Sequence, residues 1–199
     1  MTDMSIRDEH PEASPLGVWN VPNALSFGRL ALTFAVCGLI AGERWLGASA
    51  VFAVAAITDA FDGYLARLLK QETAFGRQLD PLIDKLMVLC ILVYLIPVSG
   101  SGVERWMVAA IATRELLIQA LRGHLEGGGR AFGARWSGKL KTTVQCLAIV
   151  ASLACLAWSV EPTSIGARVR DVLLWGAVAL TIYSGVAYVW SARPRWGRS

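Results

Sequence analysis

Six stretches of mostly apolar residues dominate this sequence, and each reaches the roughly 20 residues that a helix needs to cross a bilayer. They span residues 21–42, 46–69, 80–98, 104–123, 139–160 and 169–191. Of the 199 residues, 55% are hydrophobic and the mean hydropathy is +0.49, which is too apolar for an ordinary soluble domain. The sequence therefore predicts an all-α, polytopic membrane protein with six transmembrane helices.

Lysine and arginine residues gather after the second stretch, after the fourth stretch and at the C-terminus. Loops on the cytoplasmic side of a membrane carry an excess of these residues. We therefore expect both termini to be cytoplasmic, with residues 1–20 as a mobile tail and not a cleaved signal peptide. Residues 21–191 would form the six-helix membrane domain, and residues 192–199 a basic C-terminus. The net charge of +4 then reflects topology and anionic substrates or lipids, and nucleic acid need not be invoked.

The four cysteines lie inside apolar stretches without the spacing of a metal site, so we expect small buried side chains and no disulfides. The two histidines, His10 and His124, receive no role. The Gly-rich segment EGGGRAFGARWSGK, between the fourth and fifth stretches, is expected to be a flexible loop.

Four aspartates flank the connection between the second and third stretches, in the segment DAFDGYLARLLKQETAFGRQLDPLIDK. Asp59 and Asp62 are three residues apart, and Asp80 and Asp84 are four apart, so each pair shares one face of a helix. If the helices return antiparallel across about ten residues, the two acidic faces converge. Carboxylates this close repel one another unless cations lie among them, and Mg²⁺ or Mn²⁺ prefers such oxygen ligands. The pattern predicts a site for two divalent ions that hold a phosphate, beside the basic Arg67.

A simpler reading treats these charges as ordinary features of helix ends. Asp80 precedes Pro81 and could cap the third helix, while Arg67 and Lys70 could extend to the membrane surface. The repetition of helical spacing on both sides of one connection favours the metal site over this reading.

The segment also fits the pattern D-x₂-D-G-x₂-A-R-x₈-G-x₃-D-x₃-D without departure and resembles the signature of the CDP-alcohol phosphatidyltransferases. The resemblance implies a six-helix membrane enzyme of the bacterial inner membrane, forming a homodimer, with its site open to the cytoplasm. It implies that Asp59, Asp62, Asp80 and Asp84 bind two metal ions and that Asp84 is also the general base. The CDP-lipid would be accommodated by four further positions of the signature, Gly63, Ala66, Arg67 and Gly76.

Two other segments resemble bacterial phosphatidylglycerophosphate synthases: NVPNALSFGRL near the start, and TRELLIQALRGHL with the following WSGKLKTTVQ. That subgroup implies CDP-diacylglycerol and glycerol 3-phosphate as substrates. A cation inside an apolar helix is costly when unpaired, so we expect an anionic partner for Arg114. Arg114, Arg122, Lys139 and Lys141 are therefore candidates for binding the phosphate of the acceptor. Arg29, inside the first stretch, is a weaker candidate.

Other interpretations stay open from the sequence alone. Arg114 could pair with Glu115 or with a motif aspartate, and Lys139 and Lys141 could serve only as determinants of topology. The acceptor could be inositol phosphate, serine or phosphatidylglycerol with the same chemistry. A divalent-cation carrier would also place acids inside helices, although here they cluster at one end of two helices. A structural membrane protein fits the many charges least well.

Overall fold

The computed structural model describes residues 21–69, 74–127 and 136–192, and every element within them is helical. The helices are α1 (Val21–Ala41), α2 (Trp45–Leu69), α3 (Ala74–Leu95), α4 (Arg105–Gly127), α5 (Trp136–Ala157) and α6 (Ile165–Ala192). The all-α prediction is confirmed. The expected N-terminal tail, most of the Gly-rich segment and most of the basic C-terminus lie outside the described residues.

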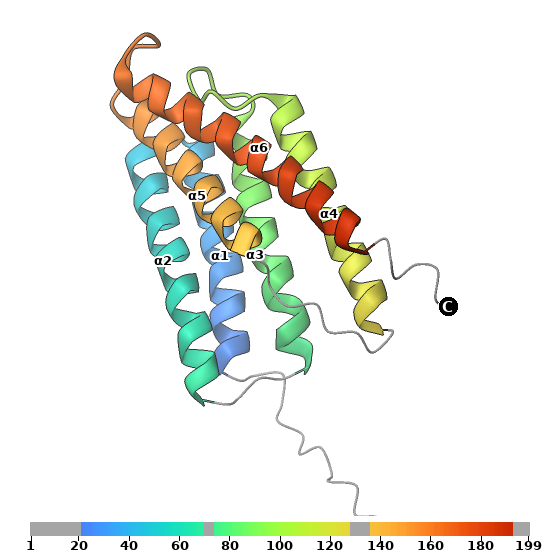
Figure 1. The fold of residues 1–199 in the computed structure, drawn as a ribbon. Helices are drawn as coiled ribbons and strands as arrows, with labels where there is room; N and C mark the ends of the chain where they lie inside the picture. The colour runs from blue at the N-terminus through green and yellow to red at the C-terminus, as the bar shows by residue number, and fades with distance from the viewer. Residues whose placement is uncertain (1–20, 70–73, 128–135, 193–199) are drawn as a thin grey trace, which may run out of the picture.

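The helices form an up-and-down bundle in which successive elements run in opposite directions (Figure 1). Helix α1 packs against both α2 and α3, α5 packs against α2, α3 and α6, and α4 packs against α3 and α6. The C-terminal end of α2 and the N-terminal end of α3 lie together at one end of the bundle, which also holds the start of α1 (Figure 1). This end is called the aspartate end below.

The apolar core fills the half of the bundle away from the aspartate end. Its largest fully buried side chains come from α1, α2, α3 and α5: Ile40, Phe52, Ile91, Leu95, Ile149 and Leu153. Two helices that end in this half, α1 and α5, close with a residue in the left-handed conformation, Glu43 (φ 56°) and Ser159 (φ 45°). In each case the next amide donates back to a carbonyl five residues earlier, which satisfies the end of the helix.

The outer surface is apolar where a soluble protein would be polar. Ile165, Val172 and Trp190 on α6 are 79%, 71% and 70% exposed, and Trp158 after α5 is 70% exposed. In contrast, Arg29, Glu115 and other polar residues are buried. Large exposed apolar surfaces mark contact with membranes or partners.

Within the described residues, α5 and α6 contain segments long and apolar enough to cross a membrane, Leu140–Ala157 and Ile165–Trp190. Shorter apolar helical segments cover Phe27–Ala41 and Trp45–Thr58. The six predicted apolar stretches therefore correspond to six helices, and two of these have the length and composition of a membrane span over their described part.

The prediction for the start of the third helix was wrong. Helix α3 begins at Ala74, six residues before the expected position. Its opening AFGRQLD is helical, although its polar residues exclude it from the apolar stretch that marked the prediction. Asp80 therefore lies inside α3, which continues through Pro81, and it does not cap the helix. Gly76 lies in the first turn of α3, and only residues 70–73 separate α2 from α3.

Candidate active site

The four aspartates of the signature lie on two helices that meet at the aspartate end. Asp59 and Asp62 belong to the C-terminal part of α2, and Asp80 and Asp84 belong to the first half of α3. Helix α1 packs against both of these helices. The topology therefore places the helix segments that carry both acidic pairs toward the same end of the bundle (Figure 1), and the convergence of their side chains stays a prediction.

The side chains of Asp59, Asp62 and Asp80 lie outside the described part of the structure, as do those of Ala66 and Arg67. Among the side chains that are described, no group of three or more His, Cys, Asp or Glu residues could hold a metal ion. The predicted metal ligands and CDP-lipid contacts at these positions, and at Gly63 and Gly76, thus stay predictions. None of the four cysteines forms a disulfide within the described residues; Cys37 and Cys155 are buried as expected, whereas Cys90 and Cys146 are only partly buried.

Asp84 is the one signature aspartate whose side chain is described, and it forms an ion pair with Arg29 of α1. The guanidinium nitrogen Nη1 of Arg29 donates to Oδ1 of Asp84. The side chain of Arg29 is 5% exposed, whereas that of Asp84 is 36% exposed. The buried arginine therefore restrains the carboxylate from the protein side while the carboxylate remains accessible to a ligand.

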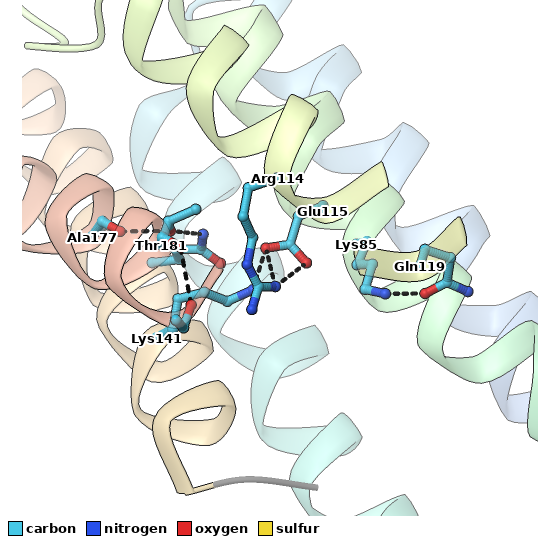
Figure 2. Close-up of polar contacts among 9 residues, drawn as sticks. Lys85, Arg114, Glu115, Gln119, Lys141, Ala177 and Thr181 are labelled. Atoms are coloured by element: carbon cyan, nitrogen blue, oxygen red, sulfur yellow. Dashed lines mark hydrogen bonds and ion pairs between the residues drawn. The ribbon is translucent and has the colours of Figure 1, made fainter. Parts of the chain in front are cut away.

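A second polar cluster lies between α4, α5 and α6 and is centred on Glu115 (Figure 2). Nζ of Lys141 donates to Oε1 of Glu115, and Nη1 of Arg114 lies 3.3 Å from both carboxylate oxygens. Glu115 and Lys141 are buried. Of the alternatives for Arg114, pairing with Glu115 is the one that the structure shows.

Neighbouring contacts extend this cluster in both directions (Figure 2). On α3, Nζ of Lys85 donates to Oε1 of Gln119, one turn beyond Glu115 on α4. On α5, Nε2 of Gln145 donates to Oγ1 of Thr181 at 3.1 Å, and Thr181 donates to the carbonyl of Ala177 at 2.6 Å. These contacts connect α3 to α4 and α5 to α6 with buried or partly buried polar groups.

The cluster carries excess positive charge among its described side chains. Lys85 and Arg114 both lie close enough to Lys141 to interact with it electrostatically, and Glu115 is the carboxylate that faces Lys141. Buried charges are normally paired, and Arg114 and Lys141 both contact Glu115, so two cations share one carboxylate and favour an additional anion. Arg114 Nε is also buried without a hydrogen bond within the described residues.

The sequence matches the family model described as CDP-alcohol phosphatidyltransferase over residues 19–183. This match covers all of α1 to α5 and most of α6. The chain belongs to the CDP-alcohol phosphatidyltransferase family. It is therefore a relative of transferases, and the helix segments that carry its signature aspartates lie toward the aspartate end of the bundle.

Curated members of the family resemble the chain over nearly its whole length. A protein of Sodalis glossinidius is 36% identical over 179 residues, covering 87% of this chain and 95% of its own. A protein of Bacillus subtilis is 34% identical over 187 residues, covering 86% and 94%. One of Escherichia coli is 34% identical over 181 residues, covering 88% and 96%. Each is named CDP-diacylglycerol–glycerol-3-phosphate 3-phosphatidyltransferase.

In this member of the family, the candidates for binding the acceptor phosphate divide into two pairs. Arg114 and Lys141 share Glu115, whereas the side chains of Arg122 and Lys139 lie outside the described residues. Sequence reasoning did not assign a site role to Glu115 or Lys85, and it ranked Arg29 low. These residues could have been found from the sequence because they are charged and lie within or next to apolar stretches, where a charge needs a partner.

Proposed function

We propose that this chain transfers the phosphatidyl group of CDP-diacylglycerol to sn-glycerol 3-phosphate, yielding phosphatidylglycerol phosphate and CMP. The observation that carries the proposal is the similarity of 34–36% along nearly the full length of the three relatives, each of which is named for this reaction. The complete aspartate signature on α2 and α3 agrees with it.

In the proposed reaction, a hydroxyl oxygen of glycerol 3-phosphate attacks the β-phosphorus of the CDP-lipid. A new phosphorus–oxygen bond forms, the bond to the CMP oxygen breaks, and the hydroxyl proton passes to Asp84. Asp84 suits the role of general base because its carboxylate is partly accessible and is oriented by Arg29.

The donor set of the signature fits divalent cations. Asp59, Asp62, Asp80 and Asp84 offer carboxylate oxygens, which are the ligands that Mg²⁺ and Mn²⁺ prefer. Two such ions, when bound, would offset negative charge on the pyrophosphate and on the departing CMP. Gly63, Ala66, Arg67 and Gly76 would accommodate the CDP moiety, with small residues permitting close approach and the arginine binding phosphate.

The Glu115 cluster supports an acceptor that carries a phosphate. Arg114 and Lys141 provide the cations, and their excess over the described carboxylate favours a dianionic group. Arg122, near the C-terminal end of α4, and Lys139, near the N-terminal end of α5, are proposed to contribute to binding of the same phosphate. Serine lacks such a group, so this cluster favours glycerol 3-phosphate over serine, although inositol phosphate would satisfy it as well.

We further propose that all six helices cross the bacterial inner membrane, with both termini and the aspartate end in the cytoplasm and with a homodimer as the working unit. The apolar exterior and the distribution of lysine and arginine support the membrane placement. Labelling with a membrane-impermeant maleimide tests the orientation in a background without native cysteines. We expect Gln71→Cys to react in inverted vesicles and Ser99→Cys in right-side-out vesicles; the opposite pattern would reverse the orientation.

The activity is tested by CMP release from CDP-diacylglycerol with a panel of acceptors. We expect release with glycerol 3-phosphate and little with inositol phosphate, serine or phosphatidylglycerol, together with loss of activity on chelation of divalent ions. Release with another acceptor but none with glycerol 3-phosphate would overturn the substrate assignment. No release with any alcohol, together with flux of Mg²⁺ into liposomes, would instead indicate a cation carrier.

A further inference from the structure

Gly185 lies in the buried face of α6, where a glycine is otherwise unfavourable. Glycine inside a helix is less favourable than alanine by about fivefold in an equilibrium constant. Gly185 is buried and follows Ser184, whose hydroxyl donates to the carbonyl of Thr181 at 3.0 Å. Because glycine is disfavoured here by helix propensity, its presence points to a contact that would disfavour a side chain at this position.

The reason is the close approach of Arg114 from α4. A Cβ atom placed on Gly185 would lie 3.0 Å from Cγ of Arg114, with Nε at 3.7 Å and Cδ at 3.9 Å. A separation of 3.0 Å between carbon atoms is well inside van der Waals contact, so the arginine stem would have to move. The backbone of α6 thus occupies the space directly behind this stem.

Arg114 has little freedom to move away. Its side chain is 15% exposed, and its Nη1 nitrogen contacts both oxygens of Glu115, which is itself held by Lys141. A shift of the stem by a few tenths of an ångström would therefore be transmitted to the guanidinium group and to the Glu115 cluster. Gly176, nine residues earlier on the same helix, differs: its added Cβ would meet only Cγ1 of Val144, at an ordinary 3.8 Å.

We infer that Gly185 is a positioning residue for binding of the acceptor: by lacking a side chain it lets α6 close behind Arg114 and directs the guanidinium toward Glu115 and the acceptor phosphate. This inference rests on the proposed function of the Glu115 cluster. It assigns a part in substrate recognition to α6, whose own sequence carries no signature residue. Contact with the substrate stays with Arg114.

The test compares Gly185→Ala with the matched control Gly176→Ala in purified full-length protein. We expect Gly185→Ala to raise the KM for glycerol 3-phosphate about three- to tenfold, with less than a twofold change in the KM for CDP-diacylglycerol. Gly176→Ala should leave both values within twofold. Equal effects of Gly185→Ala on the two KM values, or none, would overturn the inference.

A double-mutant cycle with Arg114→Ala identifies the route of the effect, because alanine lacks the Cγ atom that the new methyl group would meet. We expect Gly185→Ala to lower the thermal unfolding midpoint in the parent and to have no such effect, or a slight stabilising one, beside Arg114→Ala. If Gly185→Ala lowered the unfolding midpoint equally in the Arg114→Ala background, the effect would come from general packing of α6 and not from Arg114. That result would also overturn the inference.

The cycle separates this inference from the proposed reaction. If glycerol 3-phosphate supports no CMP release in the parent, the proposed acceptor is wrong, and the positioning role toward that acceptor falls with it. If the parent is active but the stability coupling between Gly185 and Arg114 is absent, only the inference about Gly185 is wrong.

Discussion

Arg29 on α1 and Asp84 on α3 form an ion pair in which the arginine is buried and the aspartate is partly accessible. The two residues are 55 positions apart in the sequence, so their contact depends on the packing of α1 against α3. Through this contact the first helix takes part in the site that the signature on α2 and α3 defines.

Replacing Arg29 with methionine is expected to lower kcat at least about tenfold, because the proposed base loses the cation that orients it. Methionine keeps an apolar stem of similar length, so the loss should exceed any loss of folded protein measured by thermal unfolding. Arg29→Lys, which retains the charge, should keep more activity than Arg29→Met. Equal kcat in the parent and Arg29→Met would remove this role.

The signature aspartates are expected to divide into two functional classes. Asp84→Asn should lower kcat by about 10²–10⁴, the usual contribution of a general base, while largely preserving metal-dependent binding of CDP. Asp59→Asn and Asp80→Asn should weaken that binding as well, because these residues are proposed to act only as metal ligands, whereas Asp84 is proposed to act mainly as the base. Calorimetric titration with CDP in the presence of Mg²⁺ measures the difference, and full turnover by Asp84→Asn would exclude it as the base.

The combined change Lys139→Ala and Lys141→Ala is expected to raise the KM for glycerol 3-phosphate more than the KM for CDP-diacylglycerol. The physical reason is that these cations are proposed to bind the acceptor phosphate, whereas the signature binds the nucleotide. Steady-state kinetics with each substrate varied in turn provides the measurement. A larger effect on the CDP-lipid would place the phosphate pocket elsewhere.

Glu115→Gln is expected to destabilise the protein more than Lys141→Met. The glutamine leaves both Lys141 and Arg114 without the carboxylate that they share, and removal of one partner from a buried ion pair costs about 3–5 kcal/mol. The methionine removes a buried charge and leaves Glu115 with Arg114. Thermal unfolding in one detergent compares the two variants, and a higher midpoint for Glu115→Gln would contradict this account.

Gly102→Ala is expected to lower the free energy of unfolding more than Gly100→Ala. Both glycines lie between α3 and α4 with positive φ, 73° and 85°, where a side chain costs on the order of 1 kcal/mol. An added Cβ on Gly102 would also lie 2.6 Å from Nε of Arg170, whereas one on Gly100 would lie 3.6 Å from Leu156. Equal losses of stability in the two variants would show that the contact with Arg170 is not important.

The helix content and order could be predicted from the sequence because long apolar stretches leave few alternatives to helices that bury their backbone polar groups. The start of α3 could not, because hydropathy detects long apolar stretches and the first two turns of α3 include Arg77, Gln78 and Asp80. The aspartate pairs were apparent because their spacing is local and helical.

Contacts between distant segments were harder to predict. Arg29 could have faced any helix, and only the packing of α1 against α3 selects Asp84. Glu115 is adjacent to Arg114 in the sequence, yet its contact with Lys141 depends on how α4 and α5 are arranged. Gly185 carries no side chain to attract attention, and its importance lies in the neighbour that a methyl group would displace.

The polar contacts around the two charged clusters draw on five helices, from Arg29 near the start of the chain to Thr181 near its end. A nascent polypeptide released before α6 is synthesised would contain the entire aspartate signature but would lack the backbone behind Arg114. Such a product should therefore be inactive even when it inserts correctly. A stop codon placed before α6 should therefore abolish the activity although it lies beyond the whole aspartate signature.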